Sequence, residues 1–281
     1  MNIKIAKALC LISILFFSNA FSSPDKSIDK LLNLSGTTKQ VEQLPDLISS
    51  GFIEGFSEVT TVTEEDKILL TDAIAQSFNS STFLNQIQLI VEKNISKNEM
   101  KTLLSWYESD LGKLITKAEI KASTDEAYKE IMQSINDLMK NTKRLEMAVR
   151  VEKLLNDSDK LVRLQKKIGL SVYLGIMQLL DPEAPSSDLE EFKAELANME
   201  GMLQAGIKQM IYATFIYSYQ GINDSDLGKY EKFLNTEAYQ SFNDATINGL
   251  ENGFDVVISL FTTKLAKIIK KIIEDSSEDE T

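Results

Sequence analysis

Apolar side chains recur every three or four residues along almost the whole chain, and this helical spacing constrains the fold more than any other feature. The strict two-residue alternation of half-buried strands is scarce. Only four prolines and twelve glycines interrupt the 281 residues. The sequence therefore predicts an all-α fold of about ten helices. One clear stripe consists of Met100, Leu103, Leu104, Tyr107, Leu111, Leu114, Ile115 and Ala118.

Several positions carry the signals of a helix start. Ser96 with Glu99 three residues later forms a capping box, in which each side chain satisfies a backbone N–H exposed at the start of the helix. A loop with two prolines, residues 181–186, should end the apolar helix of residues 168–180. The other predicted starts are Ser23 with Pro24 next, Thr63 before Glu64, Glu65 and Asp66, and Ser187 with Glu190 as a second capping box.

Segments of the first half match segments of the second half in the same order. Residues 28–33 align with 151–156 at an offset of 123 residues, and 95–100 with 222–227 at an offset of 127. Residues 106–110 align with 233–237 at that same offset. Helical proteins also produce such matches by chance, but the repeated order favours an internal duplication. The two related helical units would span residues 25–143 and 144–273.

The first twenty residues have the three parts of a secretory signal. Lys4 and Lys7 precede an apolar run at 8–17, and small residues follow at 18–20. Cleavage is predicted after residue 20, with Ser22 as the alternative position. An uncleaved anchor is the second interpretation, but this run is about half of the ~20 residues that a spanning helix needs. We therefore expect a periplasmic or secreted protein.

The mature chain would contain neither cysteine nor histidine, because Cys10 lies in the signal and the sequence has no histidine. Their absence excludes the usual Ser-His-Asp and Cys-His systems and the zinc sites that use these residues. The formal charge of −12 argues against a nucleic-acid partner. We therefore expect a non-enzymatic protein with no cofactor and no metal, which ends in an acidic disordered tail at 274–281.

The densest local signature lies in residues 106–113, an aromatic-Tyr-x-Ser-x-x-Gly element that follows an apolar helix. With the Leu-Leu helix and Gly-Thr turn of residues 31–37, it resembles an uncharacterised bacterial periplasmic helical family, domain of unknown function 2059. The resemblance implies export and a helical fold, and it transfers no catalytic residue because that family has no established reaction. The residues that carry the element are Trp106, Tyr107, Ser109, Asp110 and Gly112.

This sequence departs from the family element in two places. Asp110 stands where the element usually has proline, and Tyr239 replaces the second-half equivalent of Gly112. Read from the residues alone, Ser109 caps a restarting helix with Asp110 at its first position, and Thr236 with Glu237 offers the same chemistry. Trp106 and Tyr107 are then aromatic residues of the core, with a binding role as the alternative.

Two groups of acidic residues are candidate chemical sites. The pairs Glu64–Glu65 and Glu190–Glu191 suit glycoside hydrolysis in principle, but acidic residues are common in first helical turns for electrostatic reasons. Residues 223–226 have the composition of a calcium loop without its central glycine or its glutamate at the twelfth position. Stabilisation of helix starts is the favoured interpretation for the carboxylate pairs.

The last helix carries an apolar stripe flanked by lysines. It would either pack on the core, the favoured interpretation, or lie on an anionic membrane surface or a partner. The residues of the membrane or partner face are Phe254, Ile258, Phe261, Lys264, Leu265, Lys267, Ile268 and Lys271.

A second notable segment, residues 202–219, is rich in methionine and tyrosine and apolar on most of its faces. Such a helix is usually central and buried, although methionine and tyrosine also suit an apolar ligand or a peptide.

Our leading hypothesis is an exported non-enzymatic helical protein of the bacterial envelope that binds a protein, peptide or lipid partner. A peripheral membrane protein held by residues 254–273 is the alternative, and a hydrolase with carboxylate or serine chemistry is a more distant one.

Overall fold

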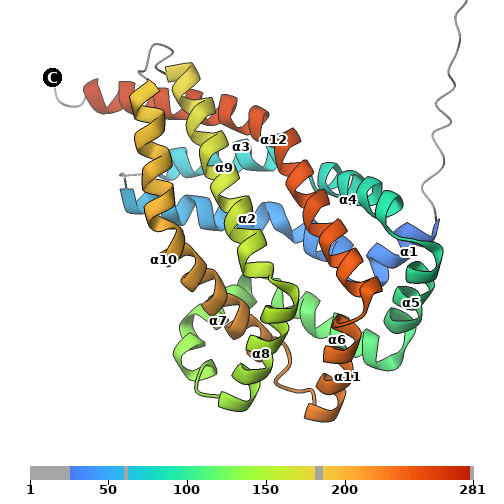
Figure 1. Cartoon of the computed structure of the whole chain (residues 1–281). Coiled ribbons are helices and arrows are strands. Elements are labelled where there is room, and N and C mark those ends of the chain that lie inside the picture. Colours follow the sequence, from blue (N-terminus) through green and yellow to red (C-terminus); the bar gives the residue numbers. More distant parts are fainter. Residues whose placement is uncertain (1–25, 60–62, 181–185, 279–281) are drawn as a thin grey trace, which may run out of the picture.

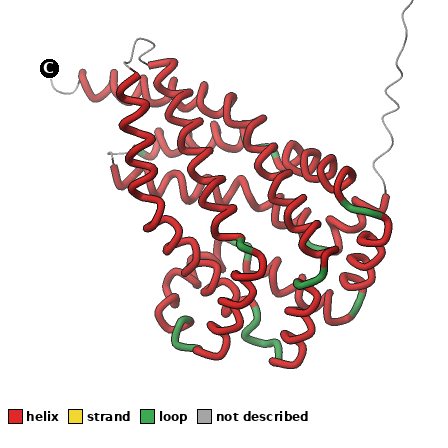
Figure 2. The backbone as a smooth tube through the Cα atoms, in the orientation of Figure 1, coloured by secondary structure: helices red, strands yellow, loops and turns green. Residues whose placement is uncertain are grey.

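The computed structural model describes residues 26–59, 63–180 and 186–278, and in these ranges the regular structure is entirely helical (Figure 2). The predicted all-α class and the expected number of helices are confirmed. The predicted signal segment, the start at Ser23 and the loop residues 181–185 lie outside these ranges. The helices are α1 (Lys26–Leu34), α2 (Thr37–Val59), α3 (Glu64–Ser77), α4 (Ser80–Asn94), α5 (Lys97–Glu108), α6 (Asp110–Ala122), α7 (Asp125–Leu138), α8 (Thr142–Leu155), α9 (Asp157–Leu180), α10 (Ser186–Ser218), α11 (Asp224–Leu234) and α12 (Glu237–Glu278).

The longest helix, α12, organises the packing. It runs across the molecule with α4 and α9 beside it and also contacts α3 and α5 (Figure 1). Its approach to α4 depends on two glycines one turn apart, Gly249 and Gly253. A Cβ atom added at Gly249 would lie 2.5 Å from the Cα of Ile87, and one at Gly253 would lie 2.4 Å from the ring of Phe83. The two helix backbones therefore meet at a distance that side chains at these positions would prevent.

One large hydrophobic core joins the two predicted units. Phe83 of α4 packs edge-to-face on Phe254 of α12, with ring centroids 5.0 Å apart, and Phe78 packs in the same way on Phe261 at 5.0 Å. Such pairs add to the stability that burial of the rings supplies. The units expected at 25–143 and 144–273 therefore share a core.

The predicted duplication is accompanied by matched helix starts. Helix α5 begins at Lys97 and α11 at Asp224, while α6 begins at Asp110 and α12 at Glu237. Both pairs differ by 127 residues, because 224 − 97 and 237 − 110 give the same value. The duplication itself stays a prediction.

Most predicted helix starts are confirmed by their hydrogen bonds. Thr63 and Ser96 each form a full capping box, with Asp66 and Glu99 respectively. The capping box at Ser187 is wrong, because α10 already begins at Ser186 and Ser187 bonds to the neighbouring Asp188 instead. The carboxylate of Glu190 pairs with Lys193 at 2.8 Å.

The boundary of the acidic tail also differs from the prediction. Helix α12 continues to Glu278, beyond the expected end at Ile273. No proline or glycine interrupts the chain after Gly253, so nothing in the backbone chemistry stops the helix there. The tail predicted for 274–281 is therefore helical through residue 278, and residues 279–281 lie outside the described ranges.

Candidate functional site

The aromatic residues of the family-like element pack against α11. Trp106 stacks on Phe233 of α11, with ring centroids 4.4 Å apart and planes 8° from parallel, and on Tyr230 at 6.0 Å. Tyr107 is 5% exposed and meets Phe233 edge-on. Both aromatic side chains therefore contribute to the core, as the favoured interpretation expects.

Ser109 and Gly112 make the break between α5 and α6. The Oγ of Ser109 accepts a hydrogen bond from the Gly112 N–H at 3.0 Å and donates one to the Trp106 carbonyl at 2.6 Å. Asp110 is the first residue of α6, as predicted. A Cβ atom added at Gly112 would lie 2.0 Å from the Trp106 carbonyl oxygen, so this tight restart requires glycine. The same cap recurs at Thr236, whose Oγ1 accepts from the Tyr239 N–H at 3.2 Å.

The apolar stripe of the last helix is part of the core. Phe254, Phe261, Leu265 and Ile268 are each no more than 9% exposed, and Ile258 is partly buried against them. These side chains are therefore not available as a free membrane face in this structure.

The lysines that flank this stripe make contacts with α3. Lys264 donates a hydrogen bond to Gln76, and Lys271 pairs with Glu65 at 2.7 Å. Lys267 is exposed. No helix in the described ranges combines the length and apolarity needed to cross a bilayer.

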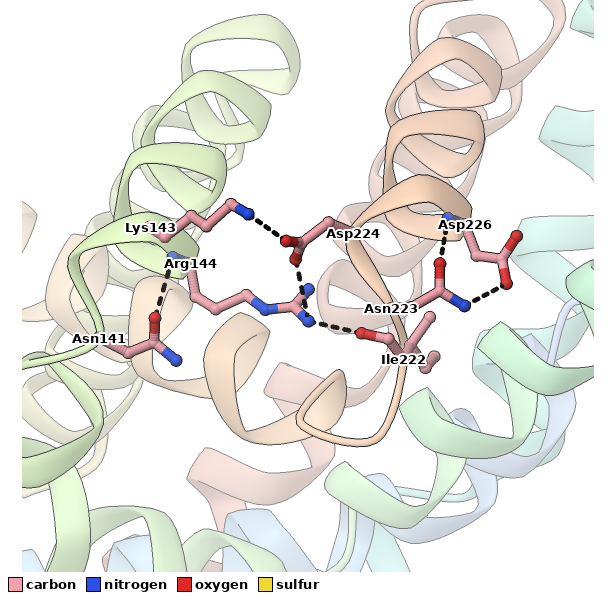
Figure 3. A network of polar contacts seen from close by, with 7 residues as sticks. All are labelled: Asn141, Lys143, Arg144, Ile222, Asn223, Asp224 and Asp226. Atoms are coloured by element: carbon pink, nitrogen blue, oxygen red, sulfur yellow. Dashed lines mark hydrogen bonds and ion pairs between the residues drawn. The ribbon is translucent and has the colours of Figure 1, made fainter.

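The acidic segment 223–226 caps α11 and joins it to α8 (Figure 3). Lys143 and Arg144 both pair with Asp224, and Arg144 also donates to the Ile222 carbonyl. The Oδ1 of Asn223 accepts from the Asp226 N–H at 3.0 Å. These contacts account for the carboxylates that suggested a calcium loop, and in the described ranges no three acidic side chains gather to hold a metal ion.

Of the two carboxylate pairs considered for hydrolysis, Glu64–Glu65 lies in the first turn of α3, as predicted. The same prediction is wrong for Glu190–Glu191, because α10 already begins at Ser186 and the pair lies in its second turn. Glu64 lies 2.7 Å from Lys67, in addition to the Glu65–Lys271 and Glu190–Lys193 pairs described above. The second residue of each pair, Glu65 and Glu191, has an exposed side chain. Glu64, Glu65 and Glu190 therefore form surface ion pairs, and only the first two also lie at a helix start.

A site that the sequence analysis missed is centred on Glu119 of α6. Its Oε1 accepts hydrogen bonds from the hydroxyls of Tyr219, just after α10, and Tyr230 of α11, both at 2.5 Å. Glu119 follows Ile115 by four residues and precedes Ala122 by three, and both of those residues are buried. A carboxyl in the middle of an apolar stripe is the sequence signal that would have found it.

The Glu119 cluster borders a cavity of about 330 Å³ between α6, α8, α10, α11 and α12, with one residue each from α2 and α9. This volume lies at the lower end of the range for small-molecule sites, about 300–1,000 Å³. A second hollow of about 210 Å³ adjoins it, and Gln40, Glu119 and Tyr239 line both. The apolar wall of the larger cavity consists of Val151, Leu155, Met210, Ile211, Phe215 and Leu234.

Half of this wall comes from the methionine- and tyrosine-rich segment of α10. Met210, Ile211 and Phe215 line the cavity. This placement is what the alternative interpretation of the segment, contact with an apolar ligand or a peptide, requires. The expectation that the segment is buried throughout is wrong at its start, where Met202 is 65% exposed. That part of α10 packs mainly on α9, so only one of its sides is covered.

The electrostatics of the cluster follow from its burial. Burial raises the pKa of Glu119, and the hydrogen bonds from Tyr219 and Tyr230 oppose that rise. Burial also raises the pKa of both tyrosines well above the ordinary value, and the charge of Glu119 adds to this shift. The two hydroxyls therefore remain protonated donors at every pH at which the protein is expected to work.

A larger hollow of about 760 Å³ lies between α1, α4 and α5. Its rim is formed by charged side chains at the surface, and two of them, Lys30 and Glu108, pair with each other. The charged side chains of this hollow are exposed, whereas two tyrosine hydroxyls hold Glu119 at its cavity, so the Glu119 cavity is the better candidate for a specific site.

Comparison with models of known protein families, with curated proteins and with solved structures found no match to this chain.

Proposed function

We propose that this chain is an exported, non-enzymatic binding protein of the bacterial envelope that holds an apolar ligand in the Glu119 cavity. The ligand would be a lipid-like molecule or the apolar side chain of a peptide. The observation that carries the proposal is the cavity of about 330 Å³, whose walls are mostly apolar and into which the half-buried Glu119 is fixed by two tyrosine hydroxyls. Apolar walls with few fixed polar groups are the general form of small-ligand sites.

Export is supported by the three-part signal at residues 1–20 and by the resemblance to the periplasmic family through residues 106–113. Both remain proposals, and so does the origin of the fold by duplication. The cavity lies where the proposed halves meet, because Glu119 comes from the first and the tyrosines from the second. A ligand there would contact both units.

The two alternative functions have less support. Attachment to a membrane through residues 254–273 would require Phe254, Phe261 and Leu265 to leave the core. A hydrolase has less support because the carboxylate pairs that suggested it lie at the surface, where Glu64 pairs with Lys67 and Glu190 with Lys193.

A cavity-filling variant tests the proposal. Thr214 of α10 lines the cavity, and Thr214→Phe would occupy part of its volume. Titration calorimetry should show saturable binding of 1-hexanol to the original protein and no binding to the variant. Gln209→Phe, at an exposed position of the same helix, is the matched control and should retain binding.

The single tryptophan supplies a second readout. Trp106 stacks on Tyr230, which lines the cavity, so its fluorescence should respond to an occupied site.

If Thr214→Phe lowers the melting temperature strongly, Ser218→Leu fills the same cavity from another position. Retention of 1-hexanol binding in a folded filling variant, or no binding in the original protein, would contradict the proposed function.

A further inference from the structure

The two oxygens of the Glu119 carboxyl have different surroundings. Oε1 accepts both tyrosine hydrogen bonds, whereas no described residue donates a hydrogen bond to Oε2. Oε2 is also not among the buried polar atoms that lack a partner, so it remains accessible from the hollows that Glu119 lines. The cluster therefore fixes one oxygen and leaves the other open to a ligand.

Glu119 also has no positively charged partner within the described ranges. The other carboxyl in the cavity wall, Asp157, pairs with Lys160 at 3.4 Å and accepts from Asn243 at 2.9 Å. A buried carboxylate without a counter-charge is costly, and a cation beside it would remove most of that cost. The unmet requirement of this cavity is a positive charge.

The remaining walls suit the body of such a cation. The rings of Tyr219, Tyr230 and Tyr239 line the cavity together with its aliphatic side chains. Aromatic faces attract an ammonium group, and the aliphatic wall suits a hydrocarbon chain. Burial raises the pKa of Tyr219 and Tyr230, so both stay neutral and add no negative charge that would attract the ammonium group away from Glu119.

We infer that the ligand of this cavity is a small organic cation, a primary ammonium group on an apolar chain, whose N–H groups donate to Oε2 of Glu119. This inference rests on the proposed function and specifies the class of its ligand. The tyrosines position the carboxyl and surround the ammonium group, while the wall from α8 and α10 takes the apolar chain.

Three ligands with the same six-carbon chain and different heads test the inference: n-hexylamine, 1-hexanol and hexanoate. At slightly alkaline pH, calorimetry should show that the amine binds about tenfold or more tightly than the alcohol, because hydrogen bonds between charged groups are the stronger ones. Hexanoate should bind most weakly, since its charge repels that of Glu119.

The variant Glu119→Gln should weaken the amine about tenfold and the alcohol far less, because only the amine loses an interaction between two charges. Glu126→Gln, which removes one negative charge at an exposed position of α7, is the matched control and should change neither. If Glu119→Gln fails to fold, the pH dependence of the original protein provides the same test. Amine binding should then weaken as the pH falls and Glu119 becomes protonated, whereas alcohol binding should not.

The pH test must take account of every titratable group that faces the cavity. These groups are Asp157 from α9, Tyr230 from α11, Tyr239 from α12 and Tyr219 from the end of α10. The tyrosines remain neutral over the acidic and neutral range, because burial raises the pKa of each. The same pH series on Asp157→Asn shows whether Glu119 alone accounts for the dependence.

The outcomes distinguish this inference from the proposed function. Equal affinities for the amine and the alcohol would overturn the cationic ligand and leave the apolar binding site in place. Tighter binding of hexanoate would do the same and would indicate a neutral carboxyl that donates to the ligand. No binding of any of the three would overturn both.

Discussion

Trp106 and Phe233, which the sequence alignment at an offset of 127 residues places in equivalent positions, stack on each other in the structure with ring centroids 4.4 Å apart. One comes from α5 and the other from α11, so equivalent residues of the two proposed units meet in the shared core. The stack borders the Glu119 cluster through Tyr230. This contact joins the packing of the fold to the candidate site.

The stack should be a major contribution to stability. Trp106→Ala and Phe233→Ala are each expected to lower the free energy of unfolding by about 3–5 kcal/mol. In a double-mutant cycle the two should couple by about 0.5–1.5 kcal/mol, because the rings interact directly. Chemical denaturation of the four proteins measures both quantities, and additive effects would show that the stack has no energy of its own.

A milder change at the same place should cost much less. The indole Nε1 of Trp106 is buried with no hydrogen-bond partner among the described residues. Trp106→Phe keeps an aromatic ring and removes that unpaired donor, so part of the cost of the lost volume is offset. We expect its loss of stability to be well below that of Trp106→Ala.

The close approach of α12 to α4 predicts opposite effects for two glycine substitutions. Gly249→Ala would place its Cβ 2.5 Å from the Cα of Ile87 and should destabilise the protein by about 1–3 kcal/mol. Gly201→Ala, in exposed α10 with no atom within 4 Å of the new Cβ, should stabilise it by up to about 1 kcal/mol. Thermal unfolding of both variants checks the signs, and a neutral Gly249→Ala would contradict this packing.

The two matched helix restarts should respond alike to loss of their caps. Ser109→Ala and Thr236→Ala each remove an acceptor for the N–H three residues later. Each should lower the free energy of unfolding by about 1 kcal/mol. A cost in one and none in the other, measured by urea unfolding, would mean that the two restarts are not energetically equivalent.

Glu119 should make stability depend on pH in a defined direction. Because burial raises its pKa in the folded protein, folding favours the protonated carboxyl. Its contribution is fully present below the ordinary carboxyl pKa of about 4.3 and is lost as the pH rises through the folded-state pKa. Relative to Glu119→Gln, whose amide oxygen still accepts from the tyrosines, the original protein should therefore lose stability as the pH rises.

Urea unfolding of both proteins, at several pH values from about 4 to about 8, measures this difference. A difference that stays constant across the range would show that Glu119 does not titrate differently in the folded and unfolded states. A difference that grows in favour of the original protein would reverse the assigned shift.

The fold was largely readable from the sequence because its signals are local. The caps at Thr63, Ser96 and Ser109 were identified from the residue itself and the next three positions, and the structure confirms them. The failure at Ser187 has a local cause too, since Ser186 already begins α10.

The candidate site was missed because it depends on contacts between distant residues. Glu119 lies 100 residues from Tyr219 and 111 from Tyr230. Tyr219 ends the methionine- and tyrosine-rich segment, but no sequence pattern links it to Glu119. Periodicity does place Glu119 on a buried face, but it does not show which side chains oppose it. Only the packing of α6 against the end of α10 and α11 brings the three together.

The most direct measurement is a crystal structure of the protein with n-hexylamine. The account predicts that the amine nitrogen lies within hydrogen-bonding distance of Oε2 of Glu119 and that the chain contacts Met210 and Phe215. An amine bound only in the hollow between α1, α4 and α5, or a Glu119 cavity that stays empty at saturating amine, would contradict it.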